Sequence, residues 1–428
     1  MKIISKVLML SLILSAQSAL ASQQGIQAQI EKLELESKSQ QKLIKQLQTQ
    51  TENFKTKNLL SMPPPQPQNI STDTSLGGYA EIGYNGYTKD VSRNQMDLKR
   101  FVLFVGHRFS DKLSFTSEVE WEHAVTSATD RGETEVEQAF LSYELNSNLK
   151  LRTGLFLMPF GFLNENHEPP VFYGVERNEV ETRIIPSTWR EGGLSLSGSQ
   201  DSGIDWQVGI VTGFNFAKFD DAASPLRAVH QELQFAKARD ISYYLSINYQ
   251  IPGFVIGSSL FTGDSSQGNS DFKSDNTKPD FSGLRGTITL WALQSRWQTL
   301  GFDFQALFAK GSLTDADKID QALQNFNLSH PTVRAYLPSE FYGWYLQAAY
   351  PISIATESKL SPFIRYEEYN TQSKMPGGFT SDPLNADRIT TLGFSLKPHP
   401  QVVFKVDYQD YRDNSANNRF NLGTGCLF

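Results

Sequence analysis

The chain has 428 residues and a formal charge of −7, and aromatic residues make up 12% of it although its mean hydropathy is only −0.38. The acidic balance disfavours nucleic-acid binding. After residue 21 no stretch reaches the roughly 20 apolar residues of a membrane-spanning helix, so we expect no helical span there. Many aromatics combined with low mean hydropathy are typical of a chain that places apolar side chains at alternate positions.

The N-terminus has the pattern of a secretory signal peptide. Lys2 and Lys6 precede an apolar run at residues 7–14, and Ala19-Leu-Ala21 supplies the small residues of a cleavage site. We therefore predict that residues 1–21 are removed on export. The single cysteine, Cys426, cannot form an internal disulfide, and we interpret it as a small apolar side chain.

A heptad pattern predicts a coiled-coil helix over residues 22–60, with a single amphipathic surface helix as the alternative. Steps of four and three separate its seam positions, which are Ile26, Ile30, Leu33, Ser37, Gln40, Ile44, Leu47, Thr51 and Phe54. Residues 61–76 include Met62-Pro-Pro-Pro-Gln-Pro67 and are predicted to form an extended linker. Self-association of the helix would make the protein an oligomer.

From Gly77 to Phe428 short segments alternate between apolar and polar side chains, and clusters of Gly, Asn, Asp, Ser and Pro separate them. The clearest segments are residues 113–121, 149–157, 204–210, 243–251, 342–350 and 402–408. The length accommodates about 16 tilted strands joined by short turns and longer loops. We predict an all-β fold, a transmembrane antiparallel β-barrel over residues 77–428. A soluble β-sandwich shows the same alternation but would not normally continue this far.

The last strand of this pattern ends on an aromatic residue. Alternate positions carry apolar or β-branched side chains, namely Phe420, Leu422, Thr424, Cys426 and Phe428. Many bacterial outer-membrane barrels end in a similar way. We therefore predict that Phe428 is a signal for the outer-membrane assembly machinery.

Three pieces of the sequence resemble the phosphate-selective porin family of Gram-negative bacteria, often labelled porin O and P. They are residues 97–106 leading into 113–120, Ala139-Phe-Leu-Ser-Tyr143 with residues 149–156, and Met158-Pro-Phe-Gly-Phe162 running to Trp189-Arg-Glu-Gly-Gly193. The resemblance implies a sixteen-stranded homotrimeric barrel in outer-membrane lipid, with the coiled coil in the periplasm. It also implies a constriction loop after the fifth or sixth strand, which residues 158–189 match.

The chain departs from that family at its basic positions. Relatives that prefer phosphate line the pore with basic residues, but here Leu157 and Met158 precede the Pro-Phe-Gly, and the loop at 158–189 has five glutamates against two arginines. Our candidate pore-lining and solute-binding residues are Lys99, Arg100, Glu118, Glu120, Glu122, Lys150, Arg152, Arg177, Arg183 and Lys405. Opposite charges on facing walls would create a transverse field, whereas the plainer interpretation is solvated lumen residues.

No enzyme or metal motif stands out. The six histidines lack metal-ligand spacing, and Gly193-Leu-Ser-Leu-Ser197 lacks the second glycine of a nucleophile elbow. We therefore predict no catalytic residue, no metal and no cofactor. The first functional hypothesis is a porin for passive diffusion of small polar or ionic solutes. The alternatives are a phosphate- or anion-selective porin, and a barrel-anchored structural tether that reaches the cell wall through the coiled coil.

Overall fold

The computed structural model describes residues 38, 41–42, 73–267, 279–329 and 335–428. The chain divides into two compact units, Met1–Leu59 and Leu60–Phe428. In the first unit Lys38, Gln41 and Lys42 are helical. The predicted signal peptide, most of the predicted coiled coil and the proline-rich segment of the linker lie outside the described residues. No described helix is both long and apolar enough to cross a membrane.

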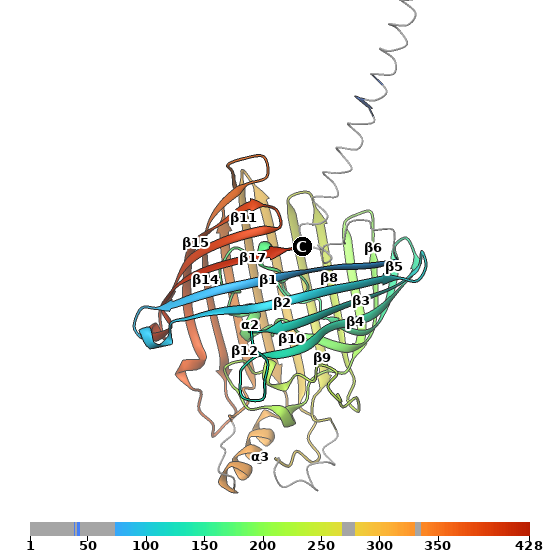
Figure 1. Ribbon diagram of the computed structural model, residues 1–428. Helices are drawn as coiled ribbons and strands as arrows, with labels where there is room; N and C mark the ends of the chain where they lie inside the picture. Colours follow the sequence, from blue (N-terminus) through green and yellow to red (C-terminus); the bar gives the residue numbers. More distant parts are fainter. Residues whose placement is uncertain (1–37, 39–40, 43–72, 268–278, 330–334) are drawn as a thin grey trace, which may run out of the picture. The chain divides into compact units, whose positions relative to one another are not determined.

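The second unit is a closed antiparallel β-barrel (Figure 1). Its wall has sixteen strands, because the two-residue β13 only continues β12 along the edge of β14. This confirms the predicted fold class, although the first strand begins ahead of the predicted Gly77. The strands are β1 (Thr74–Tyr87), β2 (Gln95–Arg108), β3 (Leu113–Glu122), β4 (Glu133–Asn146), β5 (Leu149–Leu157), β6 (Arg190–Ser199), β7 (Ile204–Val211), β8 (Ser242–Ile251), β9 (Phe254–Asp264), β10 (Thr287–Thr299), β11 (Phe302–Leu313), β12 (Glu340–Ala349), β13 (Ile352–Ser353), β14 (Lys359–Lys374), β15 (Ala386–His399), β16 (Val402–Tyr411) and β17 (Arg419–Leu427).

Short and long connections alternate around the barrel, so that tight turns gather at one end and long loops start from the other. Residues 200–203 and 252–253 form two of the short turns, whereas residues 158–189, 212–241 and 314–339 form three of the long connections. The helical segments lie in long connections. They are η1 (Val91–Arg93), η2 (Pro169–Val171), α2 (Val180–Arg183), η3 (Phe216–Lys218), η4 (Arg227–Val229), α3 (Ala316–Ser329), η6 (Pro383–Asn385) and η7 (Ser415–Asn417).

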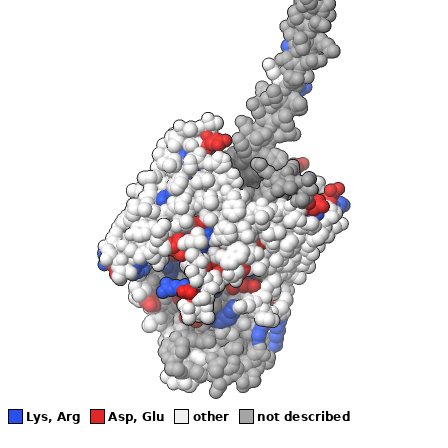
Figure 2. Space-filling model, viewed as in Figure 1, with Lys and Arg blue, Asp and Glu red and all other residues white. Residues whose placement is uncertain are grey.

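The outward face of the wall is apolar. On β8 the side chains alternate strictly, since Ser242, Tyr244 and Ser246 are buried while the exposed positions between and beyond them are Tyr243, Leu245, Ile247, Tyr249 and Ile251. In the view of Figure 2 most of the wall carries no charged side chain. A period of two with apolar residues outside is what a barrel strand in lipid requires.

The first and last strands close the barrel. β1 pairs with β17 from Tyr79 opposite Leu427 to Tyr87 opposite Arg419. Beyond the strand, the N–H of Phe428 donates to the carbonyl of Gly78 at 2.9 Å, and the Gly78 N–H donates back at 3.0 Å. The exposed Phe428 ring stacks on Phe101 of β2, with ring centroids 6.2 Å apart. The terminal residue therefore belongs to the seam.

An aromatic cluster fills one side of the barrel interior. Trp189 is fully buried, and its ring stacks on Phe214 at 5.2 Å and meets Phe261 of β9 edge-on at 4.9 Å. Phe160 packs against the indole as well, with ring centroids 5.0 Å apart. Aromatic contacts of this kind contribute about 0.5–1.5 kcal/mol each beyond the burial of area. The cluster fixes both ends of the connection between β5 and β6.

We predict that Phe428→Ser lowers the yield of assembled barrel. The variant keeps the backbone hydrogen bonds to Gly78 but loses the ring that covers Phe101. Heat-modifiable migration on gels measures the assembled fraction. Phe420→Ser is the matched control, because Phe420 is an exposed aromatic residue of β17, the strand that Phe428 directly follows. Equal yields from the two variants would contradict a special role for the terminal aromatic.

Candidate functional site

The connection between β5 and β6, which we call the inner loop (residues 158–189), crosses the interior of the barrel. Near its start the carbonyl of Pro159 accepts a hydrogen bond from Ser259 of β9 at 2.6 Å. Further along, Tyr173 donates to Asp303 of β11 at 2.8 Å, and the N–H of Val175 donates to Asp407 of β16 at 2.6 Å. The loop thus binds strands that lie far apart in the order of the sheet.

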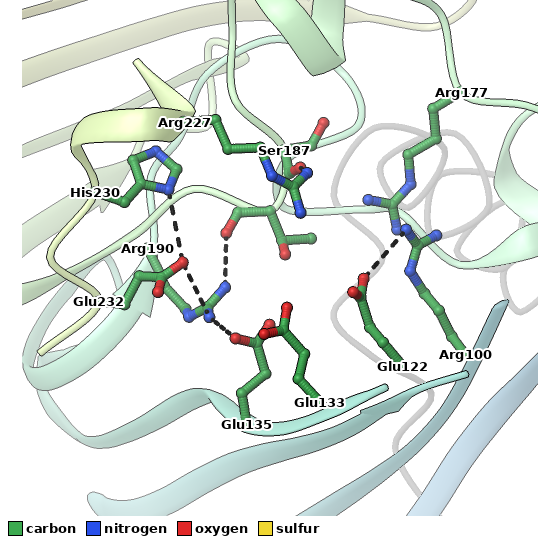
Figure 3. Close-up of a pocket in the computed structure, with 11 residues that line it drawn as sticks. Arg100, Glu122, Glu133, Glu135, Arg177, Ser187, Arg190, Arg227, His230 and Glu232 are labelled. Carbon is green, nitrogen blue, oxygen red and sulfur yellow. Dashed lines mark hydrogen bonds and ion pairs between the residues drawn. The ribbon is translucent and has the colours of Figure 1, made fainter. Parts of the chain in front are cut away.

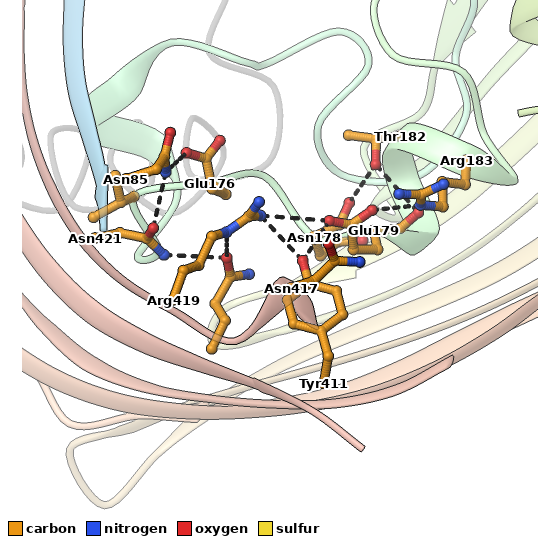
Figure 4. Close-up of polar contacts among 12 residues, drawn as sticks. Asn85, Glu176, Asn178, Glu179, Thr182, Arg183, Tyr411, Asn417, Arg419 and Asn421 are labelled. Carbon is orange, nitrogen blue, oxygen red and sulfur yellow. Dashed lines mark hydrogen bonds and ion pairs between the residues drawn. The ribbon is translucent and has the colours of Figure 1, made fainter. Parts of the chain in front are cut away.

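Glu176 attaches the inner loop to the first two strands, and Figure 4 shows its contact with Asn85 of β1. Its Oε1 accepts a hydrogen bond from Lys99 of β2 at 2.7 Å and one from Asn85 of β1 at 2.7 Å. Burial alone would raise the pKa of Glu176, but Lys99 and Arg419 outweigh it and lower this pKa to about 2. Since the pKa in the folded protein is depressed, this attachment is fully present at neutral pH and is lost only as the pH falls towards 2.

Glu179 attaches the loop to the strands near the closing seam. Its carboxylate accepts hydrogen bonds from Arg183 at 2.5 Å and from Tyr411 of β16 at 2.8 Å, and it lies 3.7 Å from Arg419 of β17 (Figure 4). Its N–H donates to Glu367 of β14 at 2.7 Å. Burial raises the pKa of Glu179, but Arg183 and Arg419 outweigh this effect and leave the pKa below its usual range.

Lys405 is bound by the inner loop as well. Its Nζ donates to the carbonyl of Gly174 at 2.8 Å and lies 3.3 Å from the centre of the Phe172 ring. The side chain is almost completely buried. The loop therefore covers this lysine instead of leaving it open to the lumen.

The wall formed by β1–β4 carries most of the acidic side chains near the loop. Arg100 pairs with Glu120 at 2.9 Å and with Glu81 at 3.2 Å, and its other nitrogen lies 3.9 Å from Glu122. Arg190 pairs with Glu135 and lies 3.3 Å from Glu232 of the connection between β7 and β8. A cavity of about 30 Å³ lies between these two arginines (Figure 3).

Deeper in the same wall His167 meets two glutamates from neighbouring strands. Its Nε2 lies 3.4 Å from Oε1 of Glu118 on β3 and 3.6 Å from Oε2 of Glu137 on β4. All three side chains are at most 2% exposed. Burial opposes a charge on the imidazole, but the two carboxylates outweigh it and raise the pKa of His167 to about 10.

Two β-bulges each insert one additional residue into a strand and place its charged side chain beside the inner loop. Glu81 lies opposite Arg100 whereas Ile82 lies opposite Leu98, which leaves Lys99 as the extra residue of β2. On β4 the register shifts in the same way, and Glu137 is the extra residue. A bulge interrupts the strict alternation of faces. Lys99 and Arg100 can therefore both contact groups inside the barrel, as can Glu137 and its neighbour Gln138.

Eight of the ten candidate residues cluster at the loop or at the wall beside it. They are Lys99, Arg100, Glu118, Glu120, Glu122, Arg177, Arg183 and Lys405. A ninth, Arg152, lies 3.9 Å from Glu165 of the loop. Lys150 lies apart, half-exposed near the tight turn and 3.6 Å from Glu144. Only β4 separates the glutamates of β3 from the basic residues of β5, so these two sets lie on one side of the barrel and not on facing walls. The transverse field itself stays a prediction.

The sequence interpretation did not single out several of the residues at this site. They are Glu81, Glu135, Glu137, His167, Glu176, Glu179, Arg190, Glu367, Asp407 and Arg419. Asp407 could have been found, since the alternation that selects Lys405 also selects it. His167 could not, because its partners lie on two strands and one of them is a bulged residue.

A solved porin structure shares the fold, and a second outer-membrane channel aligns more weakly. The chain aligns with OmpF of Salmonella typhi, solved in complex with daunomycin, at a TM-score of 0.52 and 12% identity, over 83% of this chain and 97% of that one. The outer-membrane channel DcaP of Acinetobacter baumannii aligns at a TM-score of 0.49 and 13% identity, over 85% of this chain and 100% of that one. At 12% identity the likeness to OmpF shows the architecture alone.

No family model matches the chain, so the resemblance to the phosphate-selective porins stays a prediction. An uncharacterized protein of Aquifex aeolicus (strain VF5) is 33% identical over 366 residues, which cover 84% of this chain and 81% of that protein. Identity at this level over most of both chains reaches far beyond any single motif. The chain belongs to the same family as this Aquifex aeolicus protein.

Proposed function

We propose that the chain is an outer-membrane porin through which small polar or ionic solutes diffuse passively. The inner loop carries this proposal, because it narrows the inside of a barrel whose outward face suits lipid. Charged and amide side chains line the wall beside the loop, while the aromatic cluster fills another side of the interior. Large barrels with a polar interior and an apolar outer band form aqueous channels. The predicted homotrimer and the periplasmic coiled coil stay predictions.

Among the solutes, general polar or weakly selective passage is favoured over phosphate. A phosphate site needs basic groups that are free to donate charge-assisted hydrogen bonds. Here Lys99 is bound to Glu176, Arg100 to Glu81 and Glu120, and Lys405 to a carbonyl of the loop. The acidic surroundings of the loop also work against anions. Anion selectivity is therefore our second choice.

Reconstitution in planar bilayers tests the channel itself. We expect discrete conductance steps from the purified full chain in potassium chloride, because ions diffuse through a water-filled barrel without an added energy source. A matched preparation of heat-unfolded protein should give none. A folded barrel that never conducts would contradict the porin proposal.

Reversal potentials in a potassium chloride gradient test the selectivity. We expect no strong preference for anions, since Lys99, Arg100 and Lys405 are bound within the protein and the inner loop has more glutamates than arginines. Replacing chloride by phosphate should not raise the relative anion permeability. A reversal potential close to the chloride equilibrium potential would show that the anion-selective alternative is correct.

Glu176→Gln should loosen the inner loop. Lys99 would lose its charged partner, and because this pair is only partly exposed the attachment should weaken by about 1–2 kcal/mol, between the values for surface and buried pairs. We expect more frequent current fluctuations at neutral pH. Glu357→Gln, at an exposed hairpin, is the control and should leave the recordings unchanged. Equally quiet traces from both variants would exclude Glu176 as an attachment point.

A further inference from the structure

We propose that Glu118, Glu137 and His167 form a binding site for one divalent transition-metal ion of the Zn²⁺ type. The site would join β3 and β4 of the barrel wall to the inner loop. One imidazole nitrogen and two carboxylate oxygens are ligands that Zn²⁺ accepts. The three ligand atoms lie within 4.8 Å of one another, and all three side chains are buried.

The spacing of the ligand atoms fits a metal better than a hydrogen bond. Nε2 of His167 is 3.4 Å from one carboxylate oxygen and 3.6 Å from the other. Charge-assisted N–H···O bonds are shorter, at about 2.7–2.9 Å. Two atoms bound at about 2.1 Å to a tetrahedral ion are about 3.4 Å apart. The two distances from Nε2 of His167 are therefore already near the edge length of such a tetrahedron.

In each of the three side chains one polar atom makes no hydrogen bond and lies near the corresponding atoms of the other two. The second polar atom of each side chain has a hydrogen-bond partner elsewhere. Oε1 of Glu118, Oε2 of Glu137 and Nε2 of His167 make no hydrogen bond. Nδ1 of His167 lies 3.2 Å from the carbonyl of Asn164, and Oε2 of Glu118 accepts from Gln138 at 2.7 Å. Oε1 of Glu137 accepts from Thr188. Metal ligands are oriented by such outer hydrogen bonds.

The group contains two carboxylates and one imidazole, and this excess of negative charge favours the binding of a cation. Among the described residues no lysine or arginine lies within 4.0 Å of the carboxylates of Glu118 or Glu137, so His167 is the only basic side chain in direct contact with them. A divalent ion supplies two positive charges where a proton on the imidazole supplies one. The neighbouring group of Glu120, Glu135 and Glu137 is different, because Arg100 and Arg190 already neutralise Glu120 and Glu135. The proposal therefore covers the first group alone.

Metal binding to the full chain tests the site directly and does not depend on channel activity. Protein treated with a chelator and then freed of it is titrated with Zn²⁺ by calorimetry and equilibrium dialysis. We expect one ion per chain, and weaker binding of Ca²⁺, since imidazole favours transition metals over calcium. Co²⁺ should give the visible absorption of a tetrahedral site, and anomalous scattering from a Zn²⁺ crystal should place the ion beside His167.

His167→Gln should lower the Zn²⁺ affinity at least about 100-fold, and Gln138→Leu, which removes an outer hydrogen bond, about 10–100-fold. His399→Gln is the control, because His399 is an exposed histidine beside a tight turn, and it should bind as the parent does. If a variant does not fold, the Co²⁺ spectrum of the parent protein tests the proposed site instead. The proposal is overturned if the parent protein binds no Zn²⁺, because the group is then only a protonated imidazole between two carboxylates. It is also overturned if His167→Gln and His399→Gln bind Zn²⁺ with the same affinity.

Discussion

The pairing of β1 with β17 is the constraint on which the rest of the structure depends. In lipid every backbone N–H and C=O must find a partner within the protein, and a sheet meets this demand only when its edges join. Nine register pairs along this seam, with two further hydrogen bonds between Gly78 and Phe428, remove the edges. Closure also divides the side chains of each strand between two environments. The outward set is apolar. The inward set combines the apolar side chains of the core cluster with polar and charged ones, which must find partners in a confined space.

The inner loop supplies many of those partners. Charged groups inside a narrow barrel are expensive to leave unpaired, because the surroundings solvate them less well than bulk water does. The loop brings Glu176 to Lys99 and Glu179 to Arg419, and its backbone N–H groups bind Asp407 and Glu367. Each contact neutralises or satisfies a group of the wall. The same contacts hold the loop across the barrel, so the stability of the interior and the shape of the passage arise from one set of interactions.

Much of the barrel was predictable because a period of two repeats along the whole sheet. The alternation located β3, β5, β7, β8, β12 and β16, and it placed Glu118 and Glu120 together inside. It could not locate Glu137. Phe140 and Ser142 are inward residues of the same strand, and an unbroken alternation from them would turn Glu137 outward. Nor could it locate His167, whose position depends on the path of a long loop with no repeating pattern. Local rules predict strands, while bulges and loop paths are decided by contacts between distant residues.

The two bulges at Lys99 and Glu137 interrupt the alternation of the strands, and their contacts with the inner loop explain why they are present. A bulge leaves its extra residue unpaired in the ladder and so costs stability. Lys99 and Glu137 are the extra residues on β2 and β4, and each of them binds the inner loop, Lys99 through Glu176 and Glu137 through Thr188 and His167. A regular strand would turn one of two successive side chains towards the lipid. Each bulge instead keeps a charged side chain inside at the point where the loop needs it, and the contact with the loop offsets the lost ladder bond. These two irregularities are therefore part of the loop's attachment, since they occur where β2 and β4 hold the loop.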